Sequence, residues 1–291
     1  MRNQKNSLKP IDTPVYSYWS ALYLSFFSRR LFVDVGKRWK GFSIGYLLLV
    51  IALLSIPFSL TICFSFNKFF NEQLINPLLQ LPTIYVQNGE ASINKPMPYL
   101  IKNKAKQVVL IVDTSGVING FSNKYPYLNI LINKNKMSYR IPTPQLFNGI
   151  QQEQNSRIPI EQYYSKEVNS VFNGESLVES GGIKKLKYVS QLMIYPIVIG
   201  VLFGFFVIIY PVVALLAQVF SRVFFSFQIT YLQACRLIIV SSTPMLLVLF
   251  LCLSLNWVFP GLGIILIAIL ATYYGNALSA LKAESLQLVA P

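Results

Sequence analysis

The feature that most constrains this chain is a run of 45 residues between Arg236 and Lys282 that contains no charged side chain. The turn-forming segment 256–261 (Asn-Trp-Val-Phe-Pro-Gly) divides the run. A bilayer core about 30 Å thick takes roughly 20 residues of helix, so the run predicts two membrane-spanning helices joined by a tight turn. Two further charge-free runs, 41–66 and 188–221, predict one span each.

The composition agrees with a membrane protein. Hydrophobic residues make up 54% and charged residues only 12% of the chain, whereas about a quarter of the residues of a soluble domain are charged. The net charge of +14 gathers near the ends of the predicted spans, which is typical of membrane topology and of contact with anionic lipid. No basic stripe is interleaved with aromatic residues, so we expect the lipid bilayer, and no nucleic acid, as a partner.

Histidine is absent from the chain, and its three cysteines all lie in or beside apolar runs: Cys63, Cys235 and Cys252. Without histidine the chain lacks the commonest general base and the commonest ligand of transition metals. Buried free cysteines usually act as small hydrophobic residues. We therefore expect no metal site, no cofactor and no disulfide framework.

These patterns predict an α-helical membrane protein of four transmembrane helices with an inserted small α/β extracytoplasmic domain. Five Lys or Arg precede the first run closely, which places the N-terminus, and with four spans the C-terminus, in the cytoplasm. Lysines at 184, 185 and 187 oppose this orientation, but the first span usually dominates. The predicted parts are a cytoplasmic amphipathic segment (1–40), helix 1 (41–66), the extracytoplasmic domain (67–187), helix 2 (188–217), a short cytoplasmic segment (218–236), helix 3 (237–255), helix 4 (258–281) and a cytoplasmic tail (282–291).

The N-terminal segment carries apolar residues at three- and four-residue steps between Pro14 and Val35. Such a stripe, with basic residues at its end, is typical of an amphipathic helix that lies on the inner membrane surface. A helix that packs against the protein's own cytoplasmic loop would give the same pattern. Both alternatives stay open at this point.

The inserted segment shows strand signals. The dipeptide Asn88-Gly89 stands between two short runs and predicts a hairpin, because both of its residues tolerate positive φ. The spacing of residues 160–172 predicts a helix. The whole predicts a small mixed domain with a mostly antiparallel sheet, its strands at 83–87, 90–93, 108–112, 128–132 and 137–141.

One segment invites a catalytic interpretation. The run Asp113-Thr114-Ser115-Gly116 follows an aliphatic strand, as the Asp-Thr-Gly turn of aspartic proteases does, where two such aspartates share a proton. Here Ser115 stands in place of the glycine, and the chain holds no second copy. We therefore expect no catalytic residue, and name these four residues only as weak candidates for binding a ligand or partner. Structural roles are expected for Asn88, Gly89, Asp113 and Pro244.

The predicted spans carry no ionisable residue at depth, although ion-coupled transporters usually do. They do contain prolines, among them Pro57, Pro196, Pro211 and Pro244, the last one after Ser241-Ser242-Thr243. Prolines kink helices, and nearby hydroxyl groups can cover the freed carbonyls. The pattern fits ordinary kinked helices and, as an alternative, the discontinuous helices of transporters.

Several segments in order resemble a bacterial family catalogued as domain of unknown function 1189. They are 25–28 (Ser-Phe-Phe-Ser), 38–41 (Arg-Trp-Lys-Gly), 81–83 (Leu-Pro-Thr), 88–90 (Asn-Gly-Glu), 95–99 (Lys-Pro-Met-Pro-Tyr), 111–116 (Ile-Val-Asp-Thr-Ser-Gly), Arg236 and 243–244 (Thr-Pro). The resemblance implies a bacterial inner-membrane protein with one large external loop after the first span. It implies no catalytic residue. Ser115 departs from the pattern, where a threonine would be expected.

Three functions follow as expectations. The first is a non-enzymatic accessory or sensing protein whose extracytoplasmic domain binds a ligand or a protein partner. The second is a membrane transport component in which kinked helices 3 and 4 line a path. The third is a membrane-anchored hydrolase that uses Asp113. The sequence does not determine the oligomeric state.

Overall fold

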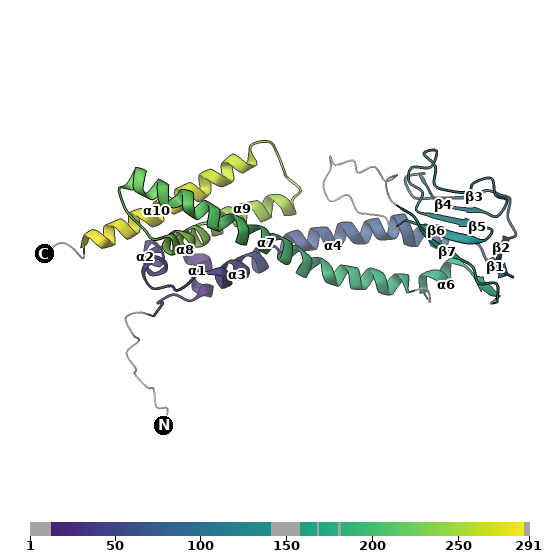
Figure 1. The fold of residues 1–291 in the computed structure, drawn as a ribbon, viewed down its shortest axis with the longest axis horizontal. Helices are drawn as coiled ribbons and strands as arrows, with labels where there is room; N and C mark the ends of the chain where they lie inside the picture. Colours follow the sequence, from purple (N-terminus) through teal and green to yellow (C-terminus); the bar gives the residue numbers. More distant parts are fainter. Residues whose placement is uncertain (1–12, 141–157, 168, 180–181, 288–291) are drawn as a thin grey trace, which may run out of the picture. The chain divides into compact units, whose positions relative to one another are not determined.

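A computed structural model describes residues 13–140, 158–167, 169–179 and 182–287. The chain divides into two compact units. We call residues 1–60 together with 195–291 the helical unit, and residues 61–194 the sheet unit. The described fold is mixed helical with two β-sheets (Figure 1).

Helices alone build the described part of the helical unit. They are α1 (Tyr18–Leu24), α2 (Arg29–Lys37), α3 (Ile44–Leu54), the first part of α4 (Ile56–Phe70), most of α7 (Ile183–Phe225), α8 (Tyr231–Ser241), α9 (Thr243–Ser254) and α10 (Leu262–Gln287). Helix α8 is central, because every residue from Ala234 to Ser241 is buried. It packs against α2, α3, α9 and α10.

The N-terminal stripe forms two helices rather than one. Ser28 separates them, and its hydroxyl caps α2 by accepting a hydrogen bond from the Leu31 N–H at 3.4 Å. Helix α2 buries Leu31, Phe32 and Val35 and packs against α8 and α10. Helix α2 thus packs on other helices of the protein, and its partners α8 and α10 are not the cytoplasmic loop that one of the two alternatives named. Helix α1 leaves Trp19 largely exposed.

Two helix pairs are sharply bent. Helices α3 and α4 meet at Ser55 with a bend of 46°, and α8 and α9 meet at Ser242 with a bend of 42°. A proline follows two residues after each of these serines, at Pro57 and Pro244. Proline has no N–H to donate to the preceding turn and its ring clashes with that turn, which explains a bend at each place.

Among the described residues, α7 and α10 are each long and apolar enough to cross a membrane. Each bent pair passes the same test if its two helices are taken as one span, so there are two to four candidate spans. The prolines at 57 and 244 predicted kinks within the runs 41–66 and 237–255, and both bends lie beside these prolines. Helix α8 also begins at Tyr231, six residues before the predicted start of helix 3.

The sheet unit holds two sheets and short helices. Its elements are the end of α4, the π-helix η1 (Asn71–Ile75), α5 (Asn76–Leu79), β1 (Ile84–Gln87), β2 (Glu90–Ile93), β3 (Tyr99–Lys102), β4 (Val108–Asp113), β5 (Ile130–Asn133), β6 (Lys136–Tyr139), β7 (Ile160–Tyr163), β8 (Ser170–Phe172), α6 (Gly174–Glu179) and the start of α7. The strand orders are β2-β1-β8 and β3-β4-β5-β6-β7. Only β4 and β5 pair in parallel among the described strands.

The predicted hairpin is present as β1 and β2. Asn88 and Gly89 form its turn with φ of 51° and 79°, the left-handed conformation that these two residue types tolerate. The predicted helix at 160–172 is wrong, because this stretch supplies β7, which pairs with β6, and β8, which pairs with β1. Pairing with strands distant in the sequence thus overrides the local helical spacing.

Apolar clusters cover both faces of the five-stranded sheet. Leu110, Val112 and Ile132 belong to a buried cluster that also includes residues of β1, β2, α5 and α6. Ile111 and Leu131, which point to the opposite face, pack with residues of the segment between β4 and β5. The complete burial of Val109 to Asp113 in β4 follows from this cover on both faces.

Candidate functional site

Asp113 ends β4 and is completely buried. Its Oδ1 accepts hydrogen bonds from the Ser115 backbone N–H, at 2.9 Å, and from the Ser115 hydroxyl. Its Oδ2 accepts one from the Ile118 backbone N–H. The carboxylate is therefore occupied with holding the turn 114–118 against the end of the strand.

Asn133 ends the neighbouring strand β5 in register with Asp113. Its Nδ2 donates to the Ile118 carbonyl at 2.8 Å, so both strand ends hold the segment at Ile118. Its Oδ1 is buried with no hydrogen-bond partner in the described structure. An aspartic protease needs a second carboxylate beside the first, so that the two share a proton. The position paired with Asp113 holds the amide of Asn133 instead.

The electrostatics of Asp113 point the same way. Burial raises the pKa of the carboxyl group, but hydrogen bonds from Ser115, Ile118 and Gly116 outweigh this effect and hold its pKa below the ordinary value. A general acid at neutral pH needs the opposite shift. The arrangement therefore suits a fixed anion that stabilises a turn. Thr114, Ser115 and Gly116 lie in that turn, at the surface or partly exposed.

A second polar cluster lies at the break between α8 and α9 in the helical unit. Ser241, Ser242 and Thr243 are all buried there, immediately before Pro244. The Thr243 hydroxyl lies 2.8 Å from the Tyr46 hydroxyl of α3 and donates to the Val240 carbonyl at 3.0 Å. The Ser241 hydroxyl is buried and has no partner in the described structure. Hydroxyl groups beside a proline can satisfy backbone groups that the break in a helix leaves free.

Arg236 is a functional candidate that sequence reasoning missed. The sequence placed it at the end of the predicted cytoplasmic segment 218–236, but it lies inside α8 and is only 9% exposed. Its Nη2 donates to the Gly36 carbonyl of α2 at 3.3 Å, and no described carboxylate lies within 4 Å of it. The capping residues Thr230 and Gln233, which start α8 before Arg236, were the signal that could have placed it inside the helix.

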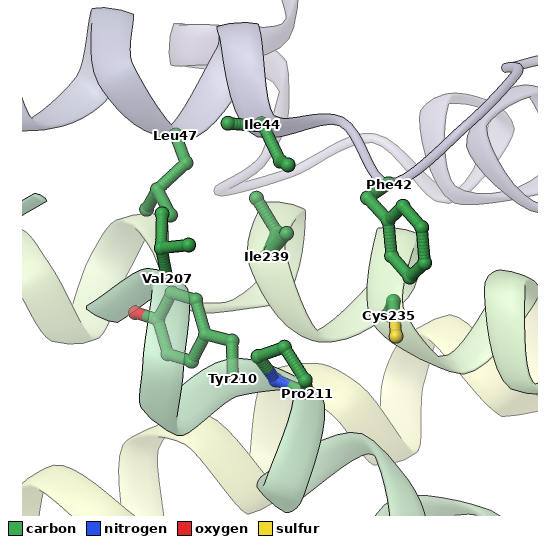
Figure 2. A pocket seen from close by; sticks show the side chains of 8 residues that line it. All are labelled: Phe42, Ile44, Leu47, Val207, Tyr210, Pro211, Cys235 and Ile239. Atoms are coloured by element: carbon green, nitrogen blue, oxygen red, sulfur yellow. The ribbon is translucent and has the colours of Figure 1, made fainter. Parts of the chain in front are cut away.

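An apolar crevice of about 160 Å³ lies where α3, α7 and α8 meet (Figure 2). Residues from three separate parts of the helical unit line it: Phe42, Ile44, Leu47, Val207, Tyr210, Pro211, Cys235 and Ile239. Cys235 and Ile239 are one turn apart on α8, so their side chains share one face of that helix. Almost no polar surface faces the crevice.

The described residues contain no group of three or more His, Cys, Asp or Glu side chains placed to hold a metal ion. The candidate sites are the turn held by Asp113, the polar break between α8 and α9, the buried Arg236 and the apolar crevice. None of these pairs a nucleophile with a base.

The comparisons with known proteins bear on the family alone. No curated protein and no solved structure matches this chain. A family model described as "Protein of unknown function (DUF1189)" matches residues 19–278, which is most of the chain. The chain therefore belongs to this family, as the segments between Ser25 and Pro244 indicate.

Proposed function

We propose that the chain is a multi-pass protein of the bacterial cytoplasmic membrane, with four spans built from α3–α4, α7, α8–α9 and α10 and with both termini in the cytoplasm. The exposure of α7 supports this placement. Only 6% of its most apolar 18-residue stretch is buried inside the protein. Such a surface is unfavourable in water, at roughly 25 cal/mol per Å² of apolar area, and a bilayer would cover it.

The membrane protein that we propose is a non-enzymatic accessory or sensing protein, whose extracytoplasmic sheet unit binds a ligand or a protein partner. The observation that carries this proposal is that α4 and α7 each pass without interruption from the helical unit into the sheet unit. A continuous helix transmits displacement better than a flexible linker does. Binding outside could thus bias the arrangement of the spans.

Hydrogen bonds attach α7 to its neighbours within each unit. In the sheet unit, Lys187 donates from Nζ to the Asn71 Oδ1 of η1 at 3.0 Å. In the helical unit, the Tyr195 hydroxyl donates to the Ala52 carbonyl of α3 at 2.8 Å. The π-helix η1, which follows α4 within the sheet unit, is a type of irregularity that often occurs at functional positions.

Transport is the second candidate function, favoured by the buried hydroxyl groups at the α8–α9 break. Ser241 carries the unpartnered hydroxyl there, and broken helices line the substrate paths of many transporters. A hydrolase that uses Asp113 is the least supported alternative, because the carboxylate is already occupied by hydrogen bonds within its own turn.

Amide hydrogen exchange of the full chain in detergent would test the coupling. The variant replaces the strand region, residues 82–172, with a short Gly-Ser linker. If the units are coupled, we expect exchange to change at the α8–α9 break around Ser242. A second variant inserts three glycines after Gln191 in α7. This insertion interrupts the helix, so we expect it to produce the same change. Unaltered exchange at the break in both variants would leave the sheet unit as a passively anchored domain.

Photo-crosslinking in native membranes would test binding. A photoreactive residue at Val117, which is 76% exposed in the sheet unit, should capture a specific ligand or protein from outside. The control position is Leu286, 61% exposed near the end of α10. Equal products at both positions, or products with detergent and bulk lipid only, would contradict a binding role for the sheet unit.

A further inference from the structure

We propose that the apolar crevice between α3, α7 and α8 binds one hydrocarbon chain of an anionic phospholipid from the cytoplasmic leaflet. The proposal rests on the membrane placement proposed above. It assigns a ligand class and a position to a site in the helical unit that is separate from the sheet unit.

The chemistry of the crevice selects an apolar occupant. A buried water needs two to four polar partners, and an apolar cavity of about 150 Å³ stays dry and accepts apolar guests. The crevice measures about 160 Å³ and its lining is apolar. Tyr210 carries the only lining hydroxyl, which Figure 2 shows at the Val207 end. A polar small molecule would find almost nothing there to orient it.

The surroundings of the crevice favour entry from the side. The crevice is partly open, and two of its lining residues, Val207 and Pro211, have strongly exposed neighbours on α7. Ile208 is 72% and Val212 is 59% exposed. In a bilayer these side chains would contact lipid chains, so that a chain could slide from the bulk lipid into the crevice without crossing water.

Positive charge lies near one end of the crevice. Figure 2 shows Leu47 and Val207 at one end and Phe42 and Cys235 at the other. Lys40 is exposed and stands two residues before Phe42, so their Cα atoms are at most about 7 Å apart.

Lys40 also lines a more polar hollow of about 390 Å³, together with Trp39 and residues 14–18. No described carboxylate forms an ion pair with Lys40. Its ammonium group thus has no carboxylate partner among the described residues and can attract a lipid phosphate, while the hydrocarbon chain of the same lipid lies beside Phe42.

Native mass spectrometry of the full chain in mild detergent would test the proposal, with added phosphatidylglycerol as the probe. The variant Val207→Phe fills the crevice, and the matched control Ile208→Phe adds the same side chain one residue away, outside the lining. We expect Val207→Phe to weaken the tightest lipid-bound state about tenfold, the effect of excluding about two methylene groups from an apolar site. Ile208→Phe should retain the lipid as the unmodified chain does.

Parallel titrations with different lipids test which molecule supplies the bound hydrocarbon chain. Phosphatidylglycerol should bind better than phosphatidylcholine, and Lys40→Gln should abolish that preference. Glycerol phosphate, which has no chain, should not compete. Tighter retention of a free fatty acid than of phosphatidylglycerol, or equal retention by Val207→Phe and the unmodified chain, would overturn the proposal.

Two further measurements, the melting temperature and the recovery of the protein with membranes, distinguish failure of the crevice proposal from misfolding and from failure of the proposed membrane placement. Added phosphatidylglycerol should raise the melting temperature of the unmodified chain but not that of Val207→Phe, and a second filling variant, Cys235→Leu, should behave like Val207→Phe. If the chain is recovered with membranes but the filling variants retain lipid normally, only the crevice proposal fails. If the chain is not recovered with membranes, the proposed placement itself fails.

Discussion

At the scale of single residues, buried polar groups are the most informative side chains in this protein. Asp113 is ionised in a buried position because backbone and hydroxyl donors within five residues surround it. Arg236 is a buried cation whose partner in the described structure is a single carbonyl group. The two differ in how they are compensated: Asp113 is satisfied locally along the chain, whereas Arg236 depends on α2, which is 200 residues away in sequence.

Replacing Asp113 with asparagine should destabilise the sheet unit. The substitution keeps the size but removes the charge that binds the Ser115 and Ile118 N–H groups. Leaving such buried donors poorly paired costs about 1–3 kcal/mol. Amide exchange of β4 in the full chain would measure the loss, with Thr114→Ala as the neighbouring control. A variant with normal protection of β4 but without cellular function would instead support a catalytic role.

The stability of the same unit should depend on pH. The folded pKa of Asp113 lies below its ordinary value, so its stabilisation is fully present above the unfolded pKa of about 3.9 and is lost as the pH falls through the folded pKa. We expect the protection of the β4 amides from hydrogen exchange to weaken in the unmodified protein as the pH falls below about 4. Asp113→Asn should show a flatter profile over this range, and parallel profiles for the two proteins would contradict the assignment.

Gly174 should tolerate no side chain. A Cβ built there would lie 1.8 Å from the Leu78 carbonyl oxygen of α5, so Gly174→Ala must move α6 away from α5. We expect a loss of about 1–3 kcal/mol, the usual cost of forcing extra atoms into a packed site. Gly120→Ala is the control, since a Cβ at that position meets nothing within 4 Å. Comparable melting temperatures for both variants would show that the α5–α6 contact is loose.

At the scale of elements, α8 organises the helical unit. It is short and bent away from α9 at Ser242, yet it packs against four other helices. One of these is the N-terminal helix α2, whose apolar face is buried by the protein itself rather than left for the membrane surface. Helix α2 is thus part of the packed unit that contains the candidate spans.

This packing of α2 predicts a large effect of Leu31→Ala. The Leu31 side chain is completely buried, and removal of a buried leucine typically costs about 2–5 kcal/mol. Thermal unfolding of the full chain in detergent would measure the effect. The control is Phe27→Ala, because Phe27 is 88% exposed. If Phe27→Ala were the more damaging of the two, α2 would not be held by the protein in solution.

At the scale of the whole molecule, the chain forms two compact units, and the boundaries between them fall within α4 and within α7. The sheet unit has its own buried cluster around Leu110 and Ile132, and the helical unit has another around Tyr46 and Leu237. Each unit therefore has an apolar core of its own.

The proposed topology predicts which positions reagents can reach in intact cells. Single cysteines would replace Ser92, Val117 and Leu286 in a chain without Cys63, Cys235 and Cys252. An impermeant maleimide should label the first two positions, in the sheet unit, and spare position 286. Labelling at position 286 alone would reverse the orientation, and labelling at all three would contradict four spans.

The sequence by itself determined what depends on local composition and spacing. The absence of charge over long runs marked the long apolar helices from α3 to α10, because length and composition alone decide whether a helix could cross a membrane. Asn88-Gly89 marked the β1–β2 turn, because few residue types adopt positive φ at low cost. The segments near Asp113 and Pro244 indicated the family. Tertiary structure decided the features that depend on distant partners.

Residues 160–172 have helical spacing but form strands, because β6 and β1 offer hydrogen-bonding edges to them. Arg236 is buried because α2 folds back and presents the Gly36 carbonyl. The crevice could not be read from the sequence either, since its lining joins residues from positions 42 to 239. Local patterns cannot encode such sites, because the free energy that forms them comes from contacts that exist only after the chain has packed.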